Sequence, residues 1–380
     1  MPTRRLFALS LLLALSLLLS LPVPQARAWT LWYVDDNGVN FAGCGTSTDP
    51  CRTIQYTLDN RALANDTLTV AAGTYSGLGN GEVFPINISK SIVIHGAGAA
   101  TTIIDAANSA VDVISVSGNI YIYIDNFTIR GGDRGIELNG PYPGVITGGV
   151  EDNTITGNAV GIYSYSTQVT VWSNDISGNT HYGVHSLYSS NASVTRNVFG
   201  WNGSAGTDAA IYNDHSDQAV VNNVIGWNNG TGIWNSWSDP TITNNTIALN
   251  YGGSGIANFT SSPVTTNNIV SGNGVYGIHA DASSVPVNSY NDVWFNGWGD
   301  YFGTSGGAGS ISANPMFVSL LDAHLLCSSP AINSGNNSAP SIPSVDYDGH
   351  PRPVGGTVDM GAYEWQSVLR CADFLPLVLR

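Results

Sequence analysis

Lysine and glutamate are almost missing from this chain of 380 residues, which contains one lysine, Lys90, and four glutamates. Its 12 Lys and Arg residues face 27 Asp and Glu residues, so the formal net charge is −15. Nucleic acids and anionic membranes bind proteins through clustered Lys and Arg, and a surface this acidic repels both. We therefore expect no nucleic-acid partner. Acidic glycans are disfavoured as well, unless a cation bridges them to the protein.

Long apolar runs are also scarce. The clear one, residues 6–21, follows Arg4 and Arg5 and precedes Ala26-Arg27-Ala28, which fits a cleavage site. We expect residues 1–28 to be a signal peptide and the mature chain to start near Trp29. No later segment is apolar enough to cross a bilayer, which needs ~20 such residues. The expected product is secreted or held at the cell surface, without a transmembrane span.

Cysteine is rare too. In an exported chain, four cysteines indicate disulfides rather than metal ligands. Cys44 and Cys51 lie close together near the N-terminus, whereas Cys327 and Cys371 bracket the C-terminal segment. We predict these two local pairs, although four cysteines allow three pairings and the sequence leaves the other two open.

Glycine is abundant and recurs in a repeat between residues 111 and 298. Each unit opens with Gly-Ile or Gly-Val, with Ala210-Ile211 in one position, at steps of 22 to 27 residues. A period this short suits one solenoid coil of three short strands rather than a helical pair. The apolar members form a predicted inner stack of β-branched residues: Ile136, Ile162, Val184, Ile211, Ile233, Ile256 and Ile278.

Asparagine occupies two further registers of the same repeat. The first holds Asn153, Asn174, Asn197, Asn223, Asn245, Asn268 and Asn291, and the second holds Asn158, Asn179, Asn202, Asn228, Asn250, Asn273 and Asn296. Asn tolerates the left-handed conformation of a tight bend, and like residues on coils ~4.8 Å apart can form hydrogen-bonded ladders. We assign these asparagines a structural role and no catalytic one.

The repeat Gly-Ile-x-x…Asn-x-Ile-x-x-Asn resembles the parallel β-helix repeat of the pectate-lyase-like superfamily. The resemblance implies an all-β fold, a single-stranded right-handed parallel β-helix. Asp49-Pro50 before Ile54 and Leu58 predicts a short capping helix near the N-terminus, with Pro in its first turn.

Both ends of the chain also resemble known modules. Residues 33–75 are similar to the N-terminal cap of secreted bacterial β-helix proteins. Residues 314–364, with Ser329-Pro330-Ala331-Ile332-Asn333 and Asp346-Tyr347-Asp348-Gly349-His350-Pro351-Arg352, resemble the choice-of-anchor Q module. The expected organisation is a cap with first coils at 29–110, β-helix repeats at 111–310 and a C-terminal cap or anchor-type module at 311–380.

The strand that begins at each Gly-Ile pair corresponds to the substrate face of the superfamily. Strand alternation puts the residue two after each Gly outward, giving Glu137, Tyr163, His185, Tyr212, Trp234, Ala257 and His279. The next outward column holds Asn139, Tyr165, Leu187, Asp214, Ser236, Phe259 and Asp281. We predict a polysaccharide-binding groove formed by Glu137, Tyr163, Tyr165, His185, Trp234, Phe259, His279 and Asp281. The alternative is that β-strands simply favour aromatic residues and pair them between neighbours.

Catalytic candidates are few. The resemblance implies a Lys or Arg base beside carboxylate-bound calcium for a lyase, but Lys90 precedes the clear repeats and neither column contains Lys or Arg. Hydrolysis needs two carboxylates ~5–9.5 Å apart, whereas Asp214 and Asp281 are three coils apart, ~14 Å. The remaining cluster is Tyr212, Asp214 and His215, a Tyr/His acid–base pair steadied by Asp. Its members could equally be turn residues with local hydrogen bonds.

Asp346-x-Asp348-Gly349 resembles the start of a calcium loop without its later ligands, and Arg352, Asp359 and Glu364 favour a polar network there. We therefore predict no metal site and no cofactor, with calcium left open, and a monomer. The leading interpretation is an extracellular β-helix that binds polysaccharide or cell-envelope glycan without a complete catalytic set. The alternatives are a polysaccharide lyase, epimerase or hydrolase, and a structural, adhesin-like surface module.

Overall fold

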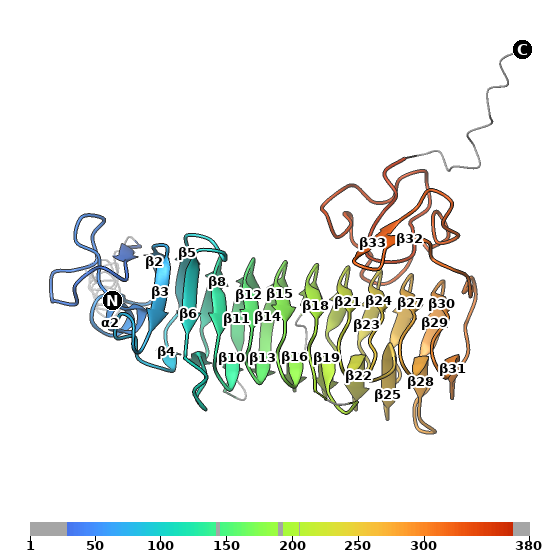
Figure 1. The fold of residues 1–380 in the computed structure, drawn as a ribbon, viewed down its shortest axis with the longest axis horizontal. Helices are drawn as coiled ribbons and strands as arrows, with labels where there is room; N and C mark the ends of the chain where they lie inside the picture. The colour runs from blue at the N-terminus through green and yellow to red at the C-terminus, as the bar shows by residue number, and fades with distance from the viewer. Residues whose placement is uncertain (1–28, 142–144, 189–192, 205, 368–380) are drawn as a thin grey trace, which may run out of the picture. The chain divides into compact units, whose positions relative to one another are not determined.

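The structure is a computed structural model that describes residues 29–141, 145–188, 193–204 and 206–367. The predicted signal peptide, residues 1–28, lies outside these ranges. The chain winds through three parallel sheets, placing one strand in each sheet per coil, and makes about ten coils (Figure 1). This arrangement confirms the predicted all-β solenoid. No helix in the described ranges has the length and apolar character that crossing a membrane requires.

The strands of each sheet pair in parallel with the strand one coil away. The first sheet contains β1 (Leu31–Val34), β2 (Asp66–Val70), β5 (Ile92–Gly96), β8 (Tyr121–Asp125), β11 (Ile146–Glu151), β14 (Thr167–Trp172), β17 (Ser193–Thr195), β20 (Ala219–Val221), β23 (Thr241–Thr243), β26 (Val264–Thr266) and β29 (Val287–Ser289). The second sheet contains β4 (Ile86–Ile88), β7 (Ile114–Ser117), β10 (Arg134–Asn139), β13 (Val160–Tyr165), β16 (Tyr182–Leu187), β19 (Ala209–Asp214), β22 (Thr231–Ser236), β25 (Ile256–Phe259), β28 (Tyr276–Ala280) and β31 (Gly299–Phe302). The third sheet contains β3 (Gly73–Ser76), β6 (Thr102–Asp105), β9 (Thr128–Arg130), β12 (Thr154–Thr156), β15 (Asp175–Ser177), β18 (Val198–Gly200), β21 (Val224–Gly226), β24 (Thr246–Ala248), β27 (Ile269–Ser271) and β30 (Asp292–Trp294).

The predicted inner stack lies in the second sheet. Its seven Ile and Val residues pair in register from Ile136 to Ile278, and each is at most 1% exposed. Strands of this kind pack β-branched side chains well on a pleated surface. The solenoid core is therefore a column of apolar side chains that continues from coil to coil.

The two asparagine ladders are also confirmed. Asn223 is typical: its backbone N–H and its Nδ2 both donate to Oδ1 of Asn245, at 2.9 and 3.0 Å, and its Nδ2 also donates to the carbonyl of Val194 at 2.8 Å. Each ladder amide thus bonds the next coil and the previous one. The left-handed conformation predicted for these asparagines is wrong, because the bend falls on the residue before each of them. Asn222, for example, has φ +56° and precedes Asn223. Since the ladder amide must point into the solenoid to reach the carbonyls, its neighbour makes the turn.

The glycine that opens each repeat lies where the coils approach closely. A Cβ at Gly135 would lie 2.6 Å from the carbonyl oxygen of Gly161 and 2.9 Å from Nδ2 of Asn158. The repeat glycines at 161, 183, 232, 255 and 277 likewise meet a carbonyl oxygen of the next coil, together with a ladder asparagine or, at Gly183, with Phe199. This glycine therefore faces inward, as does the Ile or Val after it. Two successive inward positions break the strand alternation, so the residue before each glycine returns to the outer face.

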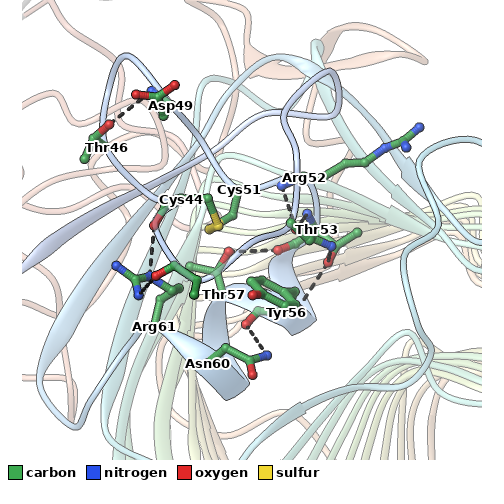
Figure 2. Close-up of a disulfide and its surroundings, with 12 residues drawn as sticks. Cys44, Thr46, Asp49, Cys51, Arg52, Thr53, Tyr56, Thr57, Asn60 and Arg61 are labelled. Carbon is green, nitrogen blue, oxygen red and sulfur yellow. Dashed lines mark hydrogen bonds between the residues drawn. A yellow bond between two sulfur atoms is a disulfide. The ribbon is translucent and has the colours of Figure 1, made fainter.

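The N-terminal cap contains α2 (Ile54–Asn60), the one helix of the described ranges (Figure 2). Its N-cap is Thr53, whose Oγ1 accepts from the N–H of Tyr56 at 3.3 Å. The predicted start at Asp49-Pro50 is wrong, because Cys51 bonds Tyr33 through its backbone and Cys44 through a disulfide, which keeps this segment outside the helix. Lys90 ends the helix by donating to the carbonyls of Leu58 and Ala62.

The C-terminal segment contains the antiparallel pair β32 (Phe317–Ser319) and β33 (Asp322–Leu325) and packs against the bend between the first and third sheets. Asn222, Asn244 and Asn267, which turn the chain there, donate to the carbonyls of Val345, Asp359 and Asn336, respectively. The Cys44–Cys51 disulfide is confirmed. Cys327 is disulfide-bonded, but its predicted partner, Cys371, lies outside the described residues.

Candidate functional site

The outer face of the second sheet carries the predicted columns of side chains. Its first column pairs in strand register without a break from Glu137 through Tyr163, His185, Tyr212, Trp234 and Ala257 to His279. Phe302 of β31 extends it by one coil. Six of the seven predicted members are partly exposed, and the seventh, Ala257, is buried at 3% exposure.

The rings of this face form one line, which we call the ring line: Tyr163, His185, Tyr212, Trp234, Phe259, His279 and Phe302. Successive centroids lie 5.2, 4.7, 6.3, 4.8, 5.3 and 5.2 Å apart. Phe259, from the second column, fills the gap at Ala257. From Tyr163 to His279, edge-to-face steps near 80° alternate with stacked steps near 25°. In an edge-to-face pair only one ring gives up a face to its neighbour, so the alternation leaves ring faces available.

Three residues of this face were missed by the sequence analysis: Arg134, Tyr182 and Tyr276. Each precedes a repeat glycine and lies on the outer face because that glycine interrupts the alternation. The Arg134 guanidinium lies 4.3 Å from the ring centroid of Tyr163 and pairs with the carboxylate of Glu137. Tyr182 and Tyr276 contact His185 and His279, with centroids 5.2 and 5.6 Å apart. The repeat glycine after each of them was the sequence signal that could have identified them.

His185 lies at the most enclosed point of the ring line, between Tyr163, Tyr182 and Tyr212. Within the described part of the chain, its Nε2 is buried and has no hydrogen-bond partner. Burial lowers the pKa of His185 to about 4, against the raising effect of the Asp214 carboxylate. The imidazole is therefore neutral near pH 7 and acts as an aromatic member of the line.

The predicted catalytic set is only partly brought together. His215 Nδ1 lies 2.7 Å from Asp214 Oδ1, as the predicted pairing of base and carboxylate requires. Tyr212 instead bonds Ser236 on the next coil and stacks on His185. Burial, together with the Asp214 charge, raises the pKa of the Tyr212 phenol, which therefore keeps its proton.

A second row of rings follows the second outward column at the turn. Tyr188, His215 and Trp237 adopt left-handed conformations with φ near +50° on successive coils, and their centroids lie 4.8 and 6.0 Å apart. Tyr188 and Trp237 are 54% and 61% exposed. His215 thus lies between two exposed aromatic rings, and this row borders the ring line on one side. Two predicted residues remain. Tyr165 packs edge-to-face on Tyr188, with centroids 6.0 Å apart. Asp281 accepts from Ser284 and Thr260 and holds the turn after β28.

The carboxylates that could suggest calcium do not fit a calcium site. Both oxygens of Asp346 accept backbone N–H groups, from His350 and Glu364. Asp348 accepts from His324. No group of three or more His, Cys, Asp or Glu side chains in the described ranges is arranged to hold a metal ion.

His324 links β33 to the loop that carries Asp348. Its Nδ1 lies 2.5 Å from Asp322 Oδ1, its Nε2 lies 2.8 Å from Asp348 Oδ2, and its ring packs on Tyr363 at 3.9 Å. Burial opposes the charged form, but the hydrogen bonds to Asp348 and Asp322 outweigh it and raise the pKa of His324. The protonated imidazole therefore bridges two carboxylates.

This link is expected to weaken as pH rises. Since the folded-state pKa of His324 is above its unfolded value, its contribution is complete below ~6.5 and is lost as pH rises through the folded-state pKa. Amide hydrogen exchange of residues 317–325, corrected for intrinsic rates, should become about twofold to fivefold faster between pH 6 and pH 9, as for an exposed ion pair. His324→Gln should abolish this dependence and His181→Gln should retain it. An unchanged pH dependence in His324→Gln would contradict the assignment.

Comparisons with known proteins agree with this geometry. Residues 144–293 match the family model "Right handed beta helix region". The crystal structure of pectate lyase Pel9A is similar, with a TM-score of 0.55 and 16% identity over 90% of this chain and 97% of that one. A rhamnogalacturonan lyase gives a TM-score of 0.35 and 12% identity, over 77% of this chain and 91% of that one. A comparison with curated proteins finds no match. The likeness to the pectate lyase shows the fold, a right-handed parallel β-helix.

Proposed function

We propose that this protein is an extracellular polysaccharide-binding β-helix that holds a glycan chain along the ring line of its second sheet. The observation that carries the proposal is the line itself, seven rings from Tyr163 to Phe302 that are all at least partly exposed. Six of them occupy one strand register, and Phe259 fills the place left by Ala257. Aromatic faces pack against the C–H surfaces of sugars, and polar neighbours bind the hydroxyls. Six coil steps of ~4.8 Å give the line a length of ~29 Å, enough for several sugar rings. The Cys44–Cys51 disulfide supports an oxidising, extracellular location.

The charges of this face favour a neutral glycan. Among the strands of the second sheet, all of which are described, Arg134 is the one Lys or Arg residue, and Glu137 already neutralises it. Asp214 and Asp281 add negative charge further along. A polyuronate would bring its carboxylates to a face without a free cation, so we expect neutral polysaccharides to bind more tightly.

A glycan array followed by calorimetric titration of the hits tests the proposal. Trp234 stacks on Phe259 at the centre of the line, so Trp234→Ala should weaken binding at least tenfold, or ~1.4 kcal/mol. Trp201→Ala is the matched control, because Trp201 stacks on Trp227 at a different bend of the solenoid. Equal affinities of the two variants, or no binding to any glycan on the array, would overturn the proposal.

The pairing of His215 with Asp214 favours a second candidate function on a uronate-containing glycan, abstraction of the proton on the carbon next to the sugar carboxylate. It requires Tyr212 as the acid and His215 as the base, on a glycan held by the same face. The glycans that bind would be incubated with the protein and their products analysed. Turnover retained in both Tyr212→Phe and His215→Ala would remove this candidate and leave binding alone.

A further inference from the structure

An apolar groove lies between the C-terminal segment and the bend that joins the third sheet to the second. Its volume is about 550 Å³, and its walls are formed on one side by Leu249, Trp294 and Phe295 and on the other by Met316, Phe317, Leu320 and Leu326. Phe295 and Leu320 are 75% and 73% exposed. An exposed apolar groove with walls from two parts of the chain is a candidate docking site for an apolar segment.

The groove continues as a row of side chains along the same bend. Trp201, Trp227, Leu249, Gly272 and Phe295 occupy it on successive coils, each with a positive φ near +60°. Four coil steps of ~4.8 Å make this row ~19 Å long. An extended segment of six residues has nearly the same length, ~20 Å at ~3.3 Å per residue.

The sequence contains such a segment, which begins seven residues after the described chain ends. Residues 374–379 read Phe-Leu-Pro-Leu-Val-Leu and lie outside the described residues. The described chain ends just after Trp365 and Gln366, beside Val318, and Trp365 and Phe317 pack against the same apolar cluster. Alternate residues of β32 therefore face the chain end and the groove.

The disulfide of Cys327 is expected to hold this segment near the groove. Cys327 follows Leu326, a wall residue of the groove, and is disulfide-bonded. Its predicted partner, Cys371, precedes Phe374 by three residues, or at most ~10 Å of chain. Such a short tether gives an effective concentration in the millimolar range, which favours an intramolecular occupant over a second copy of the chain.

The geometry points to residues 374–379 as the occupant of this groove: the apolar segment lies along the bend from Phe295 toward Trp201, held at its start by the Cys327–Cys371 disulfide. The groove is then a docking site for the chain's own apolar segment. Its position on the third-sheet bend leaves the ring line of the second sheet open.

Photo-crosslinking of the full chain tests this inference. A protein with p-benzoylphenylalanine in place of Phe374 is irradiated, and the crosslinked peptides are mapped by mass spectrometry. Benzophenone reacts well with methionine, and Met316 lies in the groove wall. We expect an intramolecular crosslink to residues 294–295 or 314–326 with a yield that does not depend on protein concentration.

Variants of the groove show whether a crosslink reflects docking in the groove or only the short tether to Cys327. Phe295→Ser with Leu320→Ser should lower the yield at least fivefold, and Leu78→Ser, at a residue 96% exposed in the N-terminal region, should leave it unchanged. Both groove residues are largely exposed, so folding should persist, which circular dichroism checks. Crosslinks only between chains, crosslinks elsewhere on the same chain, no crosslink, or an equal yield in the groove variants would each overturn the inference.

Discussion

Replacing Asn223 by alanine is expected to lower the free energy of unfolding by about 3–5 kcal/mol, the range of large single-site effects. The Asn223 side chain is fully buried, accepts from the N–H and Nδ2 of Asn197, and donates to Val194 and Asn245. Its removal leaves the Asn197 N–H and the Val194 carbonyl buried without their partner. Urea unfolding followed by circular dichroism would measure the change.

The matched control is Asn229→Ala. Asn229 is exposed, and its side chain donates one hydrogen bond, to the carbonyl of Gly203. Loss of this bond should cost less than about 1 kcal/mol because water can replace it. Coils of a solenoid contact only their neighbours, so the Asn223 variant should also unfold in two steps. Equal urea midpoints for the two variants would show that the ladder does not stabilise the coil stack.

The ladders also show why so much of the fold could be predicted. Asparagine, glycine and β-branched residues recur because each coil makes the same contacts with its neighbour. A contact that is repeated seven times produces a pattern that can be recognised in one sequence. The sequence did not predict which of two adjacent residues makes the bend, nor which residues beside the repeat glycine face outward. The bend belongs to Asn222 and not to Asn223, and the inward glycine before Ile136 sends Arg134 to the outer face.

Contacts that occur only once could not be predicted from the repeat. Arg352 bonds Asn222 across 130 residues, and no periodic pattern joins the two. The sequence nevertheless contained a signal for the bend against which the C-terminal segment packs. Asn-Asn pairs occur in three consecutive coils, at 222–223, 244–245 and 267–268, and the first member of each donates to the C-terminal segment. The candidate site does not repeat one residue type from coil to coil. Its side chains have in common only that they are rings and are exposed.

Replacing Arg352 by methionine is expected to release the C-terminal segment from the solenoid, at a cost of about 3–5 kcal/mol. The Arg352 and Glu364 side chains are fully buried and 3.0 Å apart, and Arg352 also donates to Asn222 and to the carbonyl of Gly361. Without the guanidinium, Glu364 becomes a buried charge with no cation. Limited proteolysis of residues 326–367, followed by mass spectrometry, should show cleavage that the unaltered protein resists.

The dependence of this effect on pH distinguishes charge from packing. Burial, and then the Glu364 charge, raises the pKa of Asp359 to about 7, and burial likewise raises the pKa of Glu364. A carboxyl with a raised folded-state pKa destabilises the fold as pH rises through that value. The cost of Arg352→Met should therefore shrink as pH falls from 8 to 5.5, and Glu364→Gln should partly restore the Arg352→Met protein at pH 8. Arg130→Met, which breaks the exposed pair with Asp105, should cost less than about 1 kcal/mol. A cost for Arg352→Met that stayed constant over this pH range would mean that the guanidinium acts by filling space, and that the buried carboxylates hold the C-terminal segment without it.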